Sequence, residues 1–293
     1  MKPSITLACI LLTTALTAQE CDIVAEGVVP QKAGTGFAFT EGPAIAKDGS
    51  VYFTDQPNDR IYHWDEQQGI TLWLEGTERS NGLYFNHEEK LVACADAQNR
   101  IILLESREER KVLLEGFEGK HLNGPNDLWI APNGDIYFTD AYYHRHYWPE
   151  GQLEEQVVRG VYLLRPNGKV IRVINDYKQP NGIIGTPDGK NLYVSDIEDR
   201  KIWRYEILPD GTLTGKTYFA PHGSDGMTID NRGNIYLTMG KVWVYSPEGE
   251  LISEIEVPES PSNLCFGGEE RDILFITART SVYTLKMKTR GVQ

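Results

Sequence analysis

Six oxygen-bearing side chains recur at one position of a pattern that repeats along the chain. Counting back eight residues from the turn residue before each of six similar β-rich segments gives Glu41, Asn81, Asn126, Asn181, Asp225 and Asn263. Carboxylate and amide oxygens are the ligands that hard divalent cations prefer. Two carboxylates brought together without a cation would repel each other, and removing them from water would be costly. The pattern therefore predicts one divalent metal ion, provided that the fold makes these positions converge.

A turn interpretation competes with the metal interpretation at some of these positions. Asn-Gly and Asp-Gly pairs are common in tight turns for conformational reasons alone, and for Asn81 and Asn263 we favour the turn. Glu41 has no turn preference, and the Pro-Asn-Asp sequence around Asn126 is not a hairpin dipeptide. The residues expected to bind the metal are Glu41, Asn181, Asp225 and Asn126.

Repeated strand segments supply the elements that would position these side chains. Their ends lie 39 to 56 residues apart, and they cover residues 51–55, 91–96, 136–140, 192–196, 235–239 and 273–278. Such a spacing is typical of the four-stranded blades of a β-propeller. Apolar strands flank each segment, and Asn-Gly or Asp-Gly pairs separate them as tight hairpins require. No sustained helical periodicity competes, so we expect an all-β fold.

The two ends of the repeated region indicate how the ring closes. The last repeat ends one strand short, after residues 283–287, while residues 22–29 form an additional strand before the first repeat. Pairing the two would remove the open sheet edges. We expect one domain, residues 22–290, that forms a six-bladed β-propeller of four-stranded blades, closed by an N-terminal strand on the last blade. The metal-binding positions would then lie at the mouth of the central channel.

The first residues have the features of an export signal. Lys2 gives a positive start, residues 5–16 are apolar, and the small pair Thr17-Ala18 offers a cleavage point. We expect residues 1–18 to be a signal peptide and the mature protein to be periplasmic or secreted. No membrane anchor is expected, since no later stretch of ~18 apolar residues follows.

Composition excludes several classes of partner and site. The net charge is −13 without a Lys/Arg cluster, which argues against nucleic acid and anionic membranes as partners but suits a cation. The cysteines outside the signal segment are odd in number and have no C-x-x-C spacing, so neither a disulfide framework nor a zinc-cysteine site is expected. Cys94 and Cys265 lie in apolar runs and are expected to be buried.

Five motifs resemble those of one known family. They are Glu41-Gly-Pro43, Asn123-Gly-Pro-Asn-Asp127, Pro180-Asn-Gly-Ile183, Ser224-Asp-Gly-Met227 and residues 276–281. Over essentially the whole mature chain they resemble the gluconolactonase/regucalcin (senescence marker protein) family. The resemblance implies a six-bladed propeller that hydrolyses lactones with Ca²⁺ or another divalent ion, Zn²⁺, Mn²⁺ and Mg²⁺ being alternatives. It also implies Glu41, Asn181 and Asp225 as metal ligands, with Asn126 contacting the metal or the substrate.

One position departs from that family and one segment is longer than its counterparts. Regucalcin-type members carry an arginine that touches the sugar acid where this chain has Gly124, so substrate recognition must differ in detail. The longest interval between repeats contains the aromatic segment 142–148, and such loops commonly carry specificity. The candidate substrate-binding residues are Asn123, Asn81, Tyr142, Tyr143 and His222.

The expected reaction is attack of water on a lactone carbonyl that the ion polarises. Asp225 is the candidate general base and Asn126 would orient the ring, with His222 as an alternative base. The same site could serve an organophosphate or another ester, and a non-catalytic binding propeller is a further alternative. No Gly-x-Ser-x-Gly, His-Glu-x-x-His or phosphate-loop motif supports another hydrolytic mechanism. The sequence does not indicate an oligomeric state.

Overall fold

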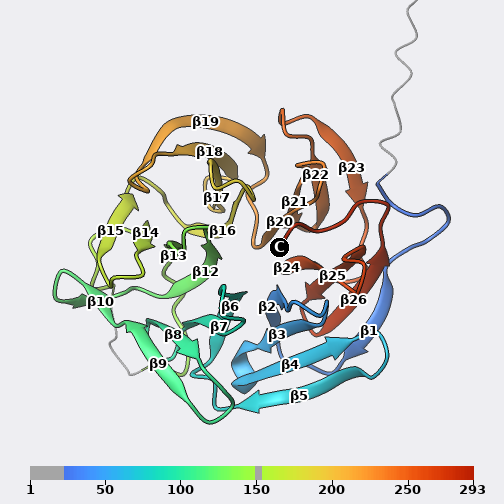
Figure 1. Ribbon diagram of the computed structural model, residues 1–293, viewed down its shortest axis with the longest axis horizontal. Coiled ribbons are helices and arrows are strands. Elements are labelled where there is room, and N and C mark those ends of the chain that lie inside the picture. The colour runs from blue at the N-terminus through green and yellow to red at the C-terminus, as the bar shows by residue number, and fades with distance from the viewer. Residues whose placement is uncertain (1–22, 149–153) are drawn as a thin grey trace, which may run out of the picture.

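A computed structural model describes residues 23–148 and 154–293. Within them, six four-stranded antiparallel sheets are arranged as blades around a central axis (Figure 1). The predicted all-β six-bladed propeller is therefore confirmed. The predicted signal segment, residues 1–18, lies outside the described residues, so export stays a prediction.

The strands of each blade follow one another from the axis outward. The first three blades are β2 (Thr40–Ile45), β3 (Val51–Asp55), β4 (Arg60–Asp65) and β5 (Gly69–Glu75); β6 (Ser80–Phe85), β7 (Leu91–Ala95), β8 (Arg100–Leu104) and β9 (Arg110–Leu114); and β12 (Pro125–Ile130), β13 (Ile136–Asp140), β14 (Gly160–Leu164) and β15 (Val170–Ile174). The next two are β16 (Pro180–Gly185), β17 (Asn191–Asp196), β18 (Lys201–Ile207) and β19 (Leu213–Pro221); and β20 (Met227–Ile229), β21 (Ile235–Met239), β22 (Lys241–Tyr245) and β23 (Leu251–Ile255). The sixth is β24 (Asn263–Gly267), β25 (Ile273–Ala278), β26 (Ser281–Lys286) and β1 (Gln31–Thr35).

Other regular elements in the described residues are small. A hairpin of β10 (Gly116–Phe117) and β11 (Lys120–His121) extends from the second blade, and the short 3₁₀ helix η1 (Gln56–Asn58) follows β3. Over the described part of the chain, no helix has the length and apolar character needed to cross a membrane.

The ring closes on an N-terminal strand, but on a later one than predicted. β1 pairs antiparallel with β26 and comprises residues 31–35, not 22–29. Upstream of it, residues 23–25 pair with the last blade only through the isolated bridge of Val24 to Met287 and two backbone hydrogen bonds beside it, and Gly27 has a φ of +71°. That conformation is favoured by glycine and belongs to a turn, so the earlier segment cannot continue as a strand.

The core lies between the blades, because each sheet turns its apolar side chains toward its neighbours. The repeated strand segments form the second strand of every blade and are almost wholly buried; four of the six carry a tyrosine, and Tyr137 and Tyr236 are fully inaccessible to solvent. Cys94 and Cys265 are buried and unpaired, as predicted. This rigid ring fixes the starts of six innermost strands around one axis.

Candidate metal centre and active site

The six predicted positions lie where the innermost strands begin. Five of them are the first or second residue of β2, β6, β12, β16 and β24, and Asp225 lies two residues before β20. These strands surround the axis (Figure 1). The turn interpretation of Asn81 and Asn263 is wrong, since both lie in strands.

Irregular pairing re-aims these side chains in four of the blades. The register between the first and second strands shifts between Glu41 and Ala44, and equivalent shifts occur at Ser80/Leu83, Pro125/Leu128 and Pro180/Ile183. A β-bulge bends its strand and redirects the side chains at that point. The Asn81-Gly82 and Asn181-Gly182 pairs therefore belong to bulges at the channel mouth, not to hairpin turns.

Glycine beside these positions lets neighbouring blades approach closely. A Cβ atom on Gly82 would lie 2.6 Å from the Asn126 carbonyl oxygen and 2.8 Å from Asp127 Oδ1. A Cβ atom on Gly226 would lie 1.9 Å from Asn263 Oδ1. Each glycine thus makes room for a candidate residue of the next blade, which draws the polar side chains together around the axis.

Hydrogen bonds join the candidate residues across blade boundaries. Asn181 Nδ2 donates to Asp225 Oδ1 at 2.8 Å, and Asn263 Nδ2 donates to Glu41 Oε2 at 3.1 Å. The backbone N–H of Gly42 also donates to Glu41 Oε2, at 2.8 Å. Glu41 is 4% exposed and Asn181 2%, while Asp225 is partly exposed. Asn181 thus contacts Asp225 directly, Glu41 contacts Asn263, and the charge of Asp225 acts on Glu41, so the three residues from three blades share the channel mouth.

The electrostatics of the cluster reflect crowding of negative charge. Burial, followed by the charge of Asp225, raises the pKa of Glu41 well above its usual range. Burial also raises the pKa of Asp225 to about 6, although the Asn181 amide and the charges of Arg279 and Arg145 oppose the shift. Both effects oppose ionisation. A cation between the two carboxylates would reverse them.

The oxygen atoms of the candidate residues fit such a cation if the asparagine amides coordinate it as well as the carboxylates. Within residues 23–148 and 154–293, no three His, Cys, Asp or Glu side chains form a group that could hold a metal ion by themselves. Amide oxygens must therefore complete any coordination shell here. Asn181 Oδ1 is such an atom, because it is buried and accepts no hydrogen bond from a described residue. A buried, unpartnered oxygen beside two carboxylates fits a hard cation.

The aromatic loop lies against this cluster. The Tyr143 hydroxyl accepts a hydrogen bond from Asn181 Nδ2 at 2.8 Å, and the Arg145 guanidinium lies over the Tyr143 ring at 5.3 Å. Asp96 holds the loop, because its carboxylate pairs with Arg145 Nε at 3.1 Å and also accepts a hydrogen bond from the Tyr147 hydroxyl. The Trp148 indole N–H donates to the Asp96 carbonyl at 2.9 Å.

The same loop explains the glycine at position 124. A Cβ atom there would lie 3.0 Å from the Ala141 carbonyl oxygen and 3.6 Å from the Trp148 ring. A large side chain at this position would therefore collide with the loop. Arg145 brings a guanidinium toward Asp225 from the loop itself.

The remaining predicted residues make other contacts. The Asn123 amide pairs with the backbone of Gln156, its Oδ1 at 3.0 Å and its Nδ2 at 3.3 Å. The Tyr142 carbonyl accepts a hydrogen bond from Gln179, and Asn81 Nδ2 donates to the Asn126 carbonyl at 3.3 Å. His222 stacks on Trp243 with 4.1 Å between ring centroids. No hydrogen bond of the described chain joins it to the cluster, and the substrate-binding roles of all these residues stay predictions.

Sequence reasoning missed Asp127 and Arg145. Asp127 is 7% exposed, and burial raises its pKa to about 7. The sequence feature that could have predicted Asp127 is its place directly after Asn126, in the bulge of β12. For Arg145, the sequence offered only its place in the insertion. The tertiary contact with Asp96 is what brings Arg145 to the cluster.

The chain was compared with protein-family models, curated proteins and solved structures. The family model of the SMP-30/gluconolactonase/LRE-like region matches residues 39–280. The chain belongs to this family. A gluconolactonase of Zymomonas mobilis is 30% identical over 285 residues, covering 86% of this chain and 80% of the relative.

Two further relatives bear on the chemistry. A gluconolactonase structure from Xanthomonas campestris is 27% identical, covers 94% of this chain and 93% of its own, and superposes with a TM-score of 0.83. The diisopropyl-fluorophosphatase of Loligo vulgaris is 28% identical over 275 residues, covering 81% of this chain and 84% of the relative. The matched region of the SMP-30/gluconolactonase/LRE-like family contains every candidate residue of the site.

Proposed function

We propose that the protein hydrolyses a sugar-type lactone at the mouth of the propeller channel. The observation that carries this proposal is the convergence of Glu41, Asn181 and Asp225, from three blades, in a member of a gluconolactonase-containing family. The gluconolactonases of Zymomonas mobilis and Xanthomonas campestris support the lactone as the substrate class.

Glu41, Asn181 and Asp225 would hold one divalent cation, with Asn126 completing the set. Ca²⁺ is favoured because all the donors are oxygens, and Zn²⁺, Mn²⁺ and Mg²⁺ are alternatives. The Asn126 amide is available, since it makes no side-chain hydrogen bond within the described chain and is 7% exposed. When bound, the cation would supply polarisation of the lactone carbonyl and stabilisation of the developing oxyanion.

Asp225 is the candidate general base. A carboxyl group with a pKa of about 6 is mostly ionised at pH 7, so it can accept a proton from the attacking water. Asn126 would orient the lactone ring, and His222, on the Trp243 ring, is the alternative base. Tyr143 and Arg145 would contact the substrate, because both lie against the cluster on the insertion loop.

The test is turnover on a panel of aldonolactones with and without chelator. We expect the wild type to hydrolyse at least one lactone, and chelation to abolish turnover while circular dichroism still reports a folded propeller. Glu41→Gln and Asp225→Asn should each lower kcat/KM by about 10³-fold, since each removes a charged ligand. Lys216→Gln, on the outer strand β19, is the control and should keep full activity. Full turnover by metal-free protein would reject the mechanism.

An organophosphate or another ester is the second candidate substrate. The specific observation in its favour is the similarity to diisopropyl-fluorophosphatase over 81% of this chain. The same panel should therefore include diisopropyl fluorophosphate and simple aryl esters. Higher kcat/KM on these compounds than on any lactone would favour this candidate. Tight metal binding without turnover on any compound would favour a binding propeller.

A further inference from the structure

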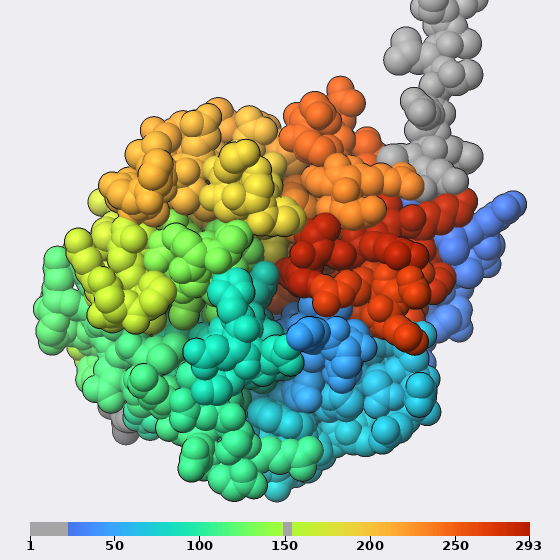
Figure 2. Space-filling view, viewed as in Figure 1, coloured from blue at the N-terminus to red at the C-terminus, as the bar shows by residue number. Residues whose placement is uncertain are grey.

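A second cavity opens at the other end of the channel. It has a volume of about 520 Å³ and is lined by turns of five blades together with the last two residues of the chain. The strands β2, β6 and β12 begin at the candidate active site, and their other ends reach this cavity. The two sites therefore lie on opposite faces. Figures 1 and 2 show the C-terminal residues at the centre of the cavity face.

The channel between the two sites is too narrow to connect them for a ligand. The void whose lining includes Asp127, Asn263 and Gln293 measures about 20 Å³, which is room for about one water molecule. A molecule in the second cavity cannot reach the candidate active site from there. The second cavity is thus a separate site, and a ligand bound in it would be independent of the proposed lactonase activity.

An aromatic wall gives the cavity a fixed apolar surface. Trp129 contributes the largest side chain and is 3% exposed. Gly185 fixes its position, because a Cβ atom there would lie 2.3 Å from the indole ring. The indole thus lies directly on the backbone of β16. Tyr84 and Phe85 are only partly buried, and with Trp129 fixed behind the wall they offer a flat apolar group a preformed surface.

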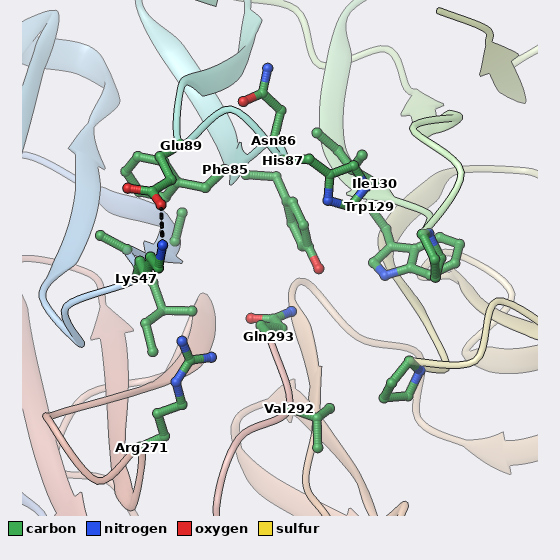
Figure 3. A pocket seen from close by; sticks show the side chains of 16 residues that line it. Lys47, Phe85, Asn86, His87, Glu89, Trp129, Ile130, Arg271, Val292 and Gln293 are labelled. Atoms are coloured by element: carbon green, nitrogen blue, oxygen red, sulfur yellow. Dashed lines mark ion pairs between the residues drawn. The ribbon is translucent and has the colours of Figure 1, made fainter.

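The opposite wall carries positive charge (Figure 3). Lys47 pairs with Glu89 at 2.9 Å, which leaves Arg271 as the cation of this wall without a counter-charge among the described residues. In that part of the chain no hydrogen bond or ion pair engages the Arg271 guanidinium, although the residue is half-buried. Figure 3 shows its side chain reaching into the space beneath Lys47. In a chain of net charge −13, acidic partners for a guanidinium are plentiful, so an unpaired one beside an apolar cavity indicates a place for an anion.

We propose that this cavity binds a small organic anion with a flat apolar body. The apolar body would lie against the partly exposed rings of Tyr84 and Phe85, and a carboxylate would pair with Arg271, whose planar fork suits bidentate binding of carboxylates. The volume falls within the range of about 300–1,000 Å³ that is usual for small-molecule sites.

Titration of the full chain with 2-naphthoate, followed by calorimetry and by quenching of tryptophan fluorescence, tests this proposal. We expect saturable one-to-one binding, and at least tenfold weaker binding of 2-naphthamide, which has the same shape without the charge. Arg271→Gln should weaken 2-naphthoate binding at least tenfold. Ala46→Trp, which fills the cavity from its rim, should abolish it.

The matched control is Arg290→Gln, because Arg290 lies near the same face but pairs with Glu270 at 2.9 Å. It should bind 2-naphthoate like the wild type. Equal affinity for the naphthoate and the amide would overturn the proposal, as would binding that neither Arg271→Gln nor Ala46→Trp weakens. Absence of binding to folded wild-type protein at millimolar probe would overturn it as well.

Discussion

At the residue scale, the candidate active site consists of carboxylates that resist ionisation where they stand. Glu41 accepts a hydrogen bond from Asn263 and Asp225 accepts one from Asn181, and burial raises the pKa of each carboxyl group. Bringing them together without a cation costs free energy, which cation binding would recover. Under the proposed function, the negative charge gathered at the channel mouth serves cation binding at a cost in stability.

Cation affinity should consequently depend on pH. Protons compete with a metal ion for the carboxylates, and a pKa of about 6 places this competition just below neutrality for Asp225. We expect the affinity for Ca²⁺ to fall about tenfold for each pH unit below 6, because one more proton must then be displaced. Competition with a fluorescent chelator at pH 8, 7, 6 and 5 measures it. An affinity that is constant over this range would contradict the assignment of Asp225 as a ligand.

At the element scale, bulges and close contacts at the starts of the innermost strands decide the geometry of the site. Four of the six innermost strands slip in register at the candidate residues. Glycines beside them let the next blade approach. The insertion between β13 and β14 adds a loop that is held by Asp96 and contacts Asn181.

Gly82→Ala should damage both stability and the site. Its Cβ atom would meet the backbone of Asn126 and the side chain of Asp127, neither of which can yield without moving β12. We expect a loss of about 1–3 kcal/mol in the free energy of unfolding and a clear loss of Ca²⁺ affinity. Gly168→Ala is the control: Gly168 has a φ of +82°, and a Cβ atom there would have no neighbour within 4 Å. It should lose about 1 kcal/mol by backbone strain alone and keep its Ca²⁺ affinity. Equal affinities in the two variants would refute the packing argument.

Asp96→Asn should release the insertion loop. The carboxylate is 3% exposed and accepts bonds from Arg145, Tyr147 and Gln56, so the variant leaves a cation unpaired. We expect KM for the best lactone to rise about tenfold with a smaller change in kcat, which corresponds to about 1–3 kcal/mol for a lost charged hydrogen bond. Asp176→Asn, which breaks a surface pair with Lys216, is the control and should leave both constants unchanged. A fall in kcat at constant KM would count against a substrate-binding loop.

At the scale of the whole molecule, the propeller depends on closure of its ring. β1 and β26 are more than 200 residues apart in sequence and pair directly. Glu259 reinforces this closure, since its carboxylate accepts bonds from Thr280, Ser281 and Tyr283 and pairs with Lys32 at 3.4 Å. Closing the ring removes both open sheet edges, and with them a route to aggregation.

Glu259→Gln should weaken the closure in a pH-dependent way. Burial alone would raise the pKa of Glu259, but bonds from Ser281, Tyr283 and Thr280 lower it from 4.5 to about 2. The carboxylate therefore stabilises the fold fully above pH 4.5, and this contribution is lost as the pH falls toward 2. We expect the variant to lose about 1–3 kcal/mol at pH 7 and the difference from wild type to shrink at pH 3. Urea unfolding at both pH values measures it, with Glu256→Gln as the surface control. A difference that grows at low pH would disprove this role.

The sequence by itself determined the fold and the chemical types at the channel mouth. A blade is a local unit of about 40 residues, so its strands, turns and the oxygen-bearing position recur at a readable spacing. The ring then follows, because equivalent positions of equivalent units must lie at equivalent places around an axis. The six recurring positions could be selected for this reason from the amino-acid sequence alone, and the family resemblance pointed to Glu41, Asn181 and Asp225 among them.

Only the tertiary structure decided which strand closes the ring and which loop residues reach the site. The closing strand was predicted at residues 22–29 and lies at 31–35, because pairing with β26 and the turn at Gly27 override local strand propensity. Arg145 reaches the cluster through Asp96, 49 residues away in sequence, and Asn263 reaches Glu41 across 222 residues. Such contacts depend on packing between blades, and no periodicity within one blade encodes them.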